Sequence, residues 1–81
     1  MKKIVPDETI DLKGVPCPQN SAKALLKLAM MDVGEVLEII IDGGEPAENV
    51  PASIEQESDF RILNCIRSED NSWHLFVKVT N

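Results

Sequence analysis

The chain has 81 residues, 43% of them hydrophobic and 27% charged, and its formal net charge is −6. This length accommodates one small domain with one core, and two cysteines are too few for the disulfide framework of a secreted mini-protein. An acidic chain without a basic stripe is a poor nucleic-acid binder, and no apolar run reaches the length of a signal-peptide core or a membrane span. We therefore expect a cytoplasmic protein with reduced thiols.

The first half of the chain predicts a strand, a helix and a second strand. Residues 9–13 alternate apolar and polar side chains, which predicts a short half-buried strand closed by Gly14. Residues 18–31 predict a helix that ends before Gly34. Its predicted buried stripe consists of Ala22, Leu25, Leu26, Ala29 and Val33. Residues 35–42 carry apolar side chains on both faces, which indicates a central strand.

The second half predicts a short helix followed by a hairpin. Residues 49–57 predict the helix, with Asn49 as its cap and Pro51 within its first turn. Residues 60–68 and 73–80 alternate in the manner of strands, and the polar segment between them predicts an antiparallel turn.

The predicted element order is β-α-β-α-β-β, which defines the fold class as α/β (α+β). Two strand–helix–strand passages followed by a hairpin favour a two-layer sandwich, with a mixed four-stranded sheet and both helices on one face. We expect residues 1–81 to form a single domain in which residues 1–7 are a loosely ordered N-terminus. The turn from the first strand to the first helix opens at the carboxyl edge of the sheet, where binding groups often collect.

A cysteine stands between two prolines at this turn, in the segment Gly14-Val15-Pro16-Cys17-Pro18. Pro18 suits the first helical position, which leaves Cys17 at or beside the N-cap, near unpaired backbone N–H groups and the positive end of the helix dipole. Such surroundings favour the thiolate and lower a cysteine pKa below its free value of about 8.5. The pattern predicts a nucleophilic sulfur, whereas an inert buried cysteine is the alternative that the flanking prolines disfavour.

Residues 12–18 resemble the signature of the TusA/SirA/YedF-like sulfur-carrier proteins, a strand followed by Gly-x-x-Cys-Pro-x-Pro and the first helix. Further similarities at residues 34–37, at Asp42 and at residues 49–51 extend the resemblance over nearly the whole chain. It implies the βαβαββ sandwich and a motif cysteine that accepts sulfane sulfur and passes it on. Asn20 replaces the second motif proline, so the pathway stays open among tRNA thiolation, selenium metabolism, sulfur oxidation and others.

Our first hypothesis is a persulfide carrier in which Cys17 takes sulfur from a protein donor, a cysteine desulfurase or another sulfurtransferase, and relays it to a protein acceptor. Four residues would shape the loop around the cysteine: Gly14, Pro16, Pro18 and Asn20. Lys23 would help electrostatically. Whether such a sulfurtransferase-like carrier counts as an enzyme stays open, and we expect no cofactor, metal, nucleic acid or membrane partner.

Two alternatives stay open beside this hypothesis. The first is a non-catalytic interaction or regulatory module that retains the fold, motivated by Asn20 and by the eleven acids of residues 32–81. The second is a redox switch between Cys17 and Cys65, which requires Cα atoms within about 7 Å of each other. The strand patterns predict Cys65 on the helix-free side of the sheet and His74, the one histidine, on an edge strand.

Overall fold

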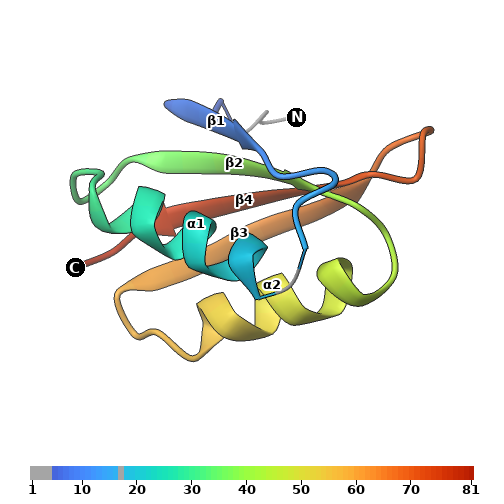
Figure 1. The fold of residues 1–81 in the computed structure, drawn as a ribbon. Coiled ribbons are helices and arrows are strands. Elements are labelled where there is room, and N and C mark those ends of the chain that lie inside the picture. Colours follow the sequence, from blue (N-terminus) through green and yellow to red (C-terminus); the bar gives the residue numbers. More distant parts are fainter. Residues whose placement is uncertain (1–4, 17) are drawn as a thin grey trace.

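The computed structural model describes residues 5–16 and 18–81, so Cys17 and residues 1–4 lie outside the described residues (Figure 1). The elements follow the predicted order. They are β1 (Glu8–Asp11), α1 (Gln19–Ala29), β2 (Val36–Ile41), α2 (Glu45–Glu55), β3 (Phe60–Arg67) and β4 (Trp73–Val79). The expected loosely ordered N-terminus includes Asp7, which forms two hydrogen bonds with Val36. The N–H of Asp7 donates to the carbonyl of Val36 at 2.8 Å, and the N–H of Val36 donates to the carboxylate of Asp7 at 2.8 Å.

The four strands form one mixed sheet in the order β1-β2-β4-β3. β1 pairs with β2 in parallel, whereas β4 pairs antiparallel with both β2 and β3. β2 and β3 therefore run in the same direction, and the last strand lies between them. Both helices cover the same face of the sheet (Figure 1). The predicted mixed sheet, the shared helix face and the central position of β2 are confirmed.

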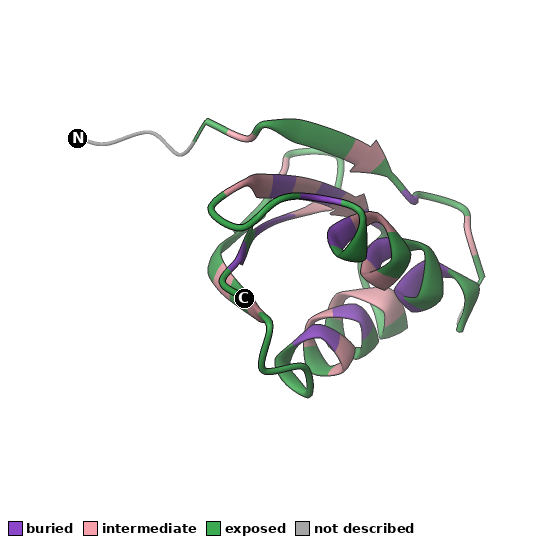
Figure 2. Cartoon of the chain, turned by 90° about the vertical axis from the view of Figure 1, so that its left-hand side faces the viewer, coloured by how far each residue is buried: buried purple, intermediate pink, exposed green. Residues whose placement is uncertain are grey.

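The core lies between the sheet and the two helices, and Figure 2 shows buried residues on both layers. Period-2 alternation places every second residue of β2 on this side, so Leu37, Ile39 and Ile41 are fully buried. The other core side chains that are wholly buried come from β4 and the helices: Leu75, Val77, Ala24, Leu28, Val50 and Ile54.

The predicted buried face of α1 is wrong except for Leu25, which is partly buried and packs against the core. The buried residues of α1 are Asn20, Ser21, Ala24 and Leu28, while Leu26 is 64% exposed. The helix carries more apolar side chains than its sheet-facing stripe can bury, and that stripe begins with two polar residues. Hydrophobic spacing could therefore not show which face of α1 is turned toward the sheet, because apolar residues at i, i+3 and i+4 spacing occur on two faces of the helix.

The predicted start of α2 at Asn49 is also wrong, because the helix begins at Glu45. Gly44 is its N-cap with φ +87, and Pro46 occupies the first turn, where a missing N–H costs nothing. Pro51 therefore lies inside the helix, where it removes one backbone donor. Two prolines five residues apart both fitted a helix start, and the sequence pattern favoured the wrong one.

A register shift in β3 changes the predicted placement of Cys65. The irregularity lies between Ile62 and Asn64, and it puts Cys65 opposite Leu75, a core residue. Partners across an antiparallel pair share a face, so Cys65 is on the helix-facing side, contrary to prediction. The placement of His74 on an edge strand is likewise wrong, since β4 is a central strand.

Candidate functional site

The chain leaves β1 through a tightly anchored turn. The N–H of Leu12 donates to the carbonyl of Ile40 at 2.8 Å, and the N–H of Val15 donates back to the carbonyl of Leu12 at 3.1 Å. Gly14 adopts φ +80, a region that glycine enters without a steric penalty. Leu12 is 3% exposed, so its side chain fixes this turn to the core.

Two contacts tie the same turn to the neighbouring connections of the sheet. The N–H of Gly14 donates to the carboxylate of Asp42 at 2.7 Å, and Lys13 Nζ lies 4.0 Å from the carboxylate of Asp70. These residues belong to the β1–α1 turn, the β2–α2 turn and the β3–β4 hairpin. All three connections gather at one end of the sheet, on the right of Figure 1. The segment that carries the cysteine motif is therefore held at this end.

The start of α1 differs from its predicted form. Pro18 is the N-cap, with φ −92 and ψ 7, and the helix begins at Gln19. The N–H of Asn20 donates to the carbonyl of Pro16 at 3.1 Å, and the N–H of Ala22 donates to the carbonyl of Pro18 at the same distance. No acidic residue occurs in the first turn. Hydrogen bonds thus join Asn20 to Pro16 and Ala22 to Pro18, and the positive end of the helix dipole has no carboxylate in its own first turn.

From the sequence, Asn20 is expected to shape the cysteine loop from the first turn of the helix, and the structure places this residue in the interior. It is 0% exposed. Its Oδ1 accepts a hydrogen bond from the N–H of Ser21 at 2.7 Å, whereas its Nδ2 has no acceptor among the described residues. The sequence offered one signal for this burial, the spacing of positions 20, 24, 28 and 31 on one helix face.

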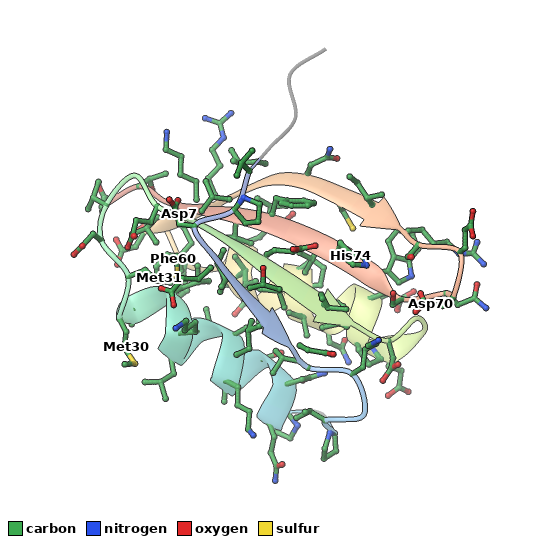
Figure 3. The ribbon with its side chains drawn as sticks, turned by 90° about the horizontal axis from the view of Figure 1, so that it is seen from above. Asp7, Met30, Met31, Phe60, Asp70 and His74 are labelled. Carbon is green, nitrogen blue, oxygen red and sulfur yellow. The ribbon has the colours of Figure 1, made fainter. Side chains whose placement is uncertain are left out.

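His74 belongs to a different network. Its Nδ1 lies 2.6 Å from Glu38 Oε2, and its Nε2 lies 3.4 Å from Ser72 Oγ. Ser72 donates its hydroxyl to Asp70 at 2.5 Å. This side-chain hydrogen bond, with one from the Ser72 N–H, lowers the pKa of Asp70 to about 2. The histidine thus bridges the sheet and the hairpin, where Figure 3 labels both His74 and Asp70.

Cys65 is an exposed free thiol at the edge strand β3. Partial burial raises the pKa of the Cys65 thiol, which lowers its thiolate fraction at neutral pH. Because the thiolate is the reactive form of a cysteine, this residue is a weak candidate for a nucleophile.

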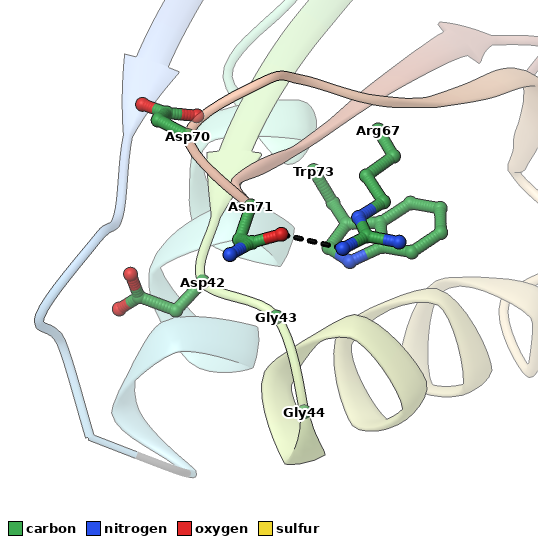
Figure 4. Close-up of a pocket in the computed structure, with 7 residues that line it drawn as sticks. All are labelled: Asp42, Gly43, Gly44, Arg67, Asp70, Asn71 and Trp73. Carbon is green, nitrogen blue, oxygen red and sulfur yellow. Dashed lines mark hydrogen bonds between the residues drawn. The ribbon is translucent and has the colours of Figure 1, made fainter.

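A surface pocket of about 600 Å³ lies between the β2–α2 turn and the β3–β4 hairpin (Figure 4). Its lining includes Trp73, and the Arg67 guanidinium donates a hydrogen bond to the side chain of Asn71. Of its carboxylates, Asp42 binds the N–H of Gly14 and Asp70 binds Ser72. The charged groups of the pocket are engaged within the protein, so it serves as a junction between connections.

A smaller groove of about 220 Å³ runs between α1 and the edge strand β1. Its lining is apolar apart from two lysines, and consists of Ile10, Lys23, Leu26, Lys27 and Met30. Met30 is 74% exposed and projects outward from the helix (Figure 3). Lys27 is paired with Glu8 at 2.6 Å. The predicted inward residue Leu26 thus contributes to an exposed apolar surface between α1 and β1.

Within residues 5–16 and 18–81, no group of three or more His, Cys, Asp or Glu side chains could hold a metal ion. In the same part of the chain, no helix is long and apolar enough to cross a membrane.

The architecture defines a small two-layer α/β protein in which the turn from β1 into α1 carries the cysteine motif. The chain belongs to the sulfurtransferase TusA family, whose model matches residues 8–79. The resemblance inferred from the cysteine motif is therefore confirmed.

Individual relatives agree with this assignment. A "Putative sulfur carrier protein" of Archaeoglobus fulgidus is 32% identical over 77 residues, which cover 95% of this chain and 86% of that protein. The "Putative sulfur carrier protein YedF" of Escherichia coli K12 is 37% identical over 51 residues, 63% of this chain and 66% of that protein. The crystal structure of a SirA-like protein from Desulfitobacterium hafniense shares the fold, with a TM-score of 0.76 at 19% identity, over 91% of this chain and 99% of that one.

Proposed function

We propose that this chain is a cytoplasmic sulfur carrier that holds sulfane sulfur as a persulfide on Cys17. The observation that carries the proposal is the anchoring of the motif on both sides of position 17. Before it, Gly14 is bound to Asp42, and after it the N–H of Asn20 is bound to the carbonyl of Pro16. A rigid corner of this kind is suited to presenting a side chain to a second protein.

The transfer step needs one thiolate and one persulfide. The thiolate of Cys17 attacks the outer sulfur of a donor persulfide, and a bond forms between Cys17 Sγ and that sulfur. The sulfur–sulfur bond of the donor breaks, and its electron pair stays on the donor's inner sulfur, which leaves as a thiolate. The proton remains on the transferred sulfur, so the product is Cys17–S–SH with no net oxidation. In the second transfer, an acceptor thiolate attacks the outer sulfur of Cys17–S–SH. The sulfur–sulfur bond breaks, and Cys17 leaves as the thiolate.

The charges around the start of α1 support a thiolate at Cys17. The first turn lacks carboxylates, and Lys23 stands one turn further along the helix with an exposed side chain. The partial positive charge of a helix N-terminus favours an anion by about 0.3–1 kcal/mol at exposed positions. Both contributions act in the direction that a nucleophilic sulfur requires.

The proposal is tested by loading the protein with sulfur. The chain is incubated with a cysteine desulfurase and cysteine, and its intact mass is measured before and after treatment with dithiothreitol. We expect the mass to rise by one sulfur atom, reductant to remove that sulfur, and Cys17→Ser to abolish the gain. Cys65→Ser is the matched control and should load as the parent does. The proposal fails if the parent gains no reducible sulfur, or if Cys17→Ser still gains it.

The second candidate function is a protein-interaction module that does not carry sulfur. The exposed apolar groove between α1 and β1 favours it, since Leu26 and Met30 there are 64% and 74% exposed. A pull-down with the parent chain and with Cys17→Ser separates the two functions. Equal capture of a partner by both, without sulfur loading of the parent, would support the module, whereas capture that depends on loaded Cys17 supports the carrier.

A further inference from the structure

The side chain of Asn20 presents an unusual arrangement in the first turn of α1. It is 0% exposed, and its Nδ2 finds no acceptor in the described part of the chain. Leaving a buried amide donor unpaired costs about 1–3 kcal/mol, so buried polar groups almost always have a partner. A donor kept at this expense, three residues after the motif cysteine, points to an acceptor that is supplied by the function.

The backbone donors around it are already in use. The N–H of Asn20 is bound to Pro16, the N–H of Ser21 to Asn20 Oδ1, and the N–H of Ala22 to Pro18. An anion at the start of α1 therefore cannot rely on these three groups. The Nδ2 of Asn20 is a buried donor of this turn that has no acceptor among the described residues.

The internal bonds of Asn20 also orient its amide. Because Oδ1 accepts from the N–H of Ser21 at 2.7 Å, the planar amide is fixed and Nδ2 is held on the opposite side. The bond from the Asn20 N–H to the Pro16 carbonyl closes a short ring of the chain that contains position 17. Asn20 therefore stands at the end of the hydrogen-bonded segment 16–20, three residues after Cys17 in the sequence.

We propose that the Nδ2 group of Asn20 donates a hydrogen bond to the anionic sulfur on Cys17, both as the thiolate and as the persulfide anion. This inference rests on the proposed function of Cys17. A hydrogen bond to the charged form stabilises that form, so it lowers the pKa of the sulfur and raises the fraction ready to react. The residue that this chain has in place of the second motif proline would thus act in sulfur chemistry, beyond shaping the loop.

The first experiment measures thiol ionisation with no sulfur donor present. In a Cys65→Ser background, the rate of alkylation of Cys17 by iodoacetamide is followed from low to high pH for the parent, Asn20→Leu and Ser21→Ala. Leucine has the same branched skeleton of heavy atoms as asparagine but no donor, and Ser21 is the neighbouring buried polar residue of the same turn. We expect Asn20→Leu to raise the Cys17 pKa by about one unit, so that alkylation at pH 6 slows about tenfold while the rates converge at high pH. Ser21→Ala should follow the parent.

Superimposed profiles for a folded Asn20→Leu variant and the parent would overturn the proposal. Folding is checked by circular dichroism. If the variant does not fold, a second measurement on the folded parent decides: the side-chain amide signals of Asn20 are followed by NMR during a pH titration. We expect them to shift with the midpoint of Cys17 ionisation and to lose this shift in Cys17→Ser. The proposal would also be overturned if the Asn20 amide signals did not shift as Cys17 ionises, or if they shifted equally in Cys17→Ser.

The outcomes separate this proposal from the function on which it rests. If the parent never loads sulfur from a persulfide donor but Asn20→Leu still raises the Cys17 pKa, the carrier function fails and the hydrogen bond to the thiolate stands. If the parent loads sulfur but neither the alkylation profile nor the amide signals respond, the carrier function stands and the role of Asn20 fails.

Discussion

The two helices have the same length and lie on the same face of the sheet, but their first turns are built differently. α2 begins with Glu45 and Glu48, which stabilise its positive end. The first turn of α1 has no acid, and the described residues give neither helix a side-chain N-cap. One N-terminus is neutralised by its own sequence, and the other is left positive.

The proposed function of Cys17 offers a physical reason for this difference. Carboxylates in the first turn of α1 would stabilise the helix, but they would also repel an anionic sulfur at Cys17. The chain instead keeps its acids elsewhere: residues 1–31 carry five lysines against three acids, whereas residues 32–81 carry eleven acids against three basic residues. Under the proposed function, the start of α1 is left without acids because it must accommodate an anionic sulfur.

The largest predicted effect tests whether the helices differ only at their first turns. Leu28 of α1 and Ile54 of α2 are both fully buried against the sheet. Leu28→Ala and Ile54→Ala should each lower the free energy of unfolding by about 2–5 kcal/mol, because each leaves a cavity in the core. Leu26→Ala, at an exposed position of α1, should change it by less than about 0.5 kcal/mol.

Urea unfolding followed by circular dichroism measures all three variants. A much smaller cost for Leu28→Ala than for Ile54→Ala would show that α1 is the more weakly held helix. In that case the lack of acids in the first turn of α1 would reflect loose packing of this helix. The difference between the two helices would then not be explained by the charge that their first turns must accommodate.

The sequence predicted the architecture well because period-2 alternation in residues 35–42 and 73–80 is strong and the element order leaves few topologies. It failed where two physical solutions were equally good. Pro46 and Pro51 both suit a helix start, and the apolar residues of α1 form stripes on two sides. The irregularity in β3 near Ile62 carries no glycine or proline signal, so the reversal of face at Cys65 could not be read from the pattern.

The candidate site was predictable only as a motif. The segment 14–18 identified the cysteine and its turn, because prolines and glycine constrain the backbone locally. The contact from Gly14 to Asp42 depends on which strand ends meet in space, which the sequence does not state. The burial of Asn20 depends on the phase of α1, and that phase is set by packing against the whole sheet.

A smaller effect is expected when a carboxylate is added to the first turn of α1 and, in a separate variant, removed from the first turn of α2. Gln19 of α1 is exposed, so Gln19→Glu adds a carboxylate beside the cysteine motif without disturbing the core. We expect the Cys17 pKa to rise and alkylation at neutral pH to slow about two- to fivefold, which corresponds to about 0.3–1 kcal/mol. Glu48→Gln in α2 should leave Cys17 alkylation unchanged. Equal effects of the two variants would show that net charge, rather than its place in α1, controls the thiol.

The smallest predicted effect concerns Asp70, a carboxylate in the lining of the pocket that also includes Gly44, the N-cap of α2. Its pKa is lowered from 3.8 to about 2, first by the side-chain hydrogen bond from Ser72 and then by the backbone one. Because the folded pKa lies below the unfolded one, the ionised carboxylate stabilises the protein above about pH 4, and this contribution disappears as the pH falls through about 2.

Asp70→Asn removes that titration while preserving the shape of the side chain. Its free energy of unfolding should therefore lie slightly below that of the parent near neutral pH, and the gap should close between about pH 4 and pH 2. The gap stays small because the carboxylate is exposed to solvent. Cys17 alkylation should be unaffected, since Asp70 reaches the cysteine turn only through a 4.0 Å contact with Lys13. A gap that persists unchanged at low pH would mean that Ser72 does not favour the ionised form of Asp70. A change in thiol reactivity would show that Asp70 influences the cysteine turn through Lys13.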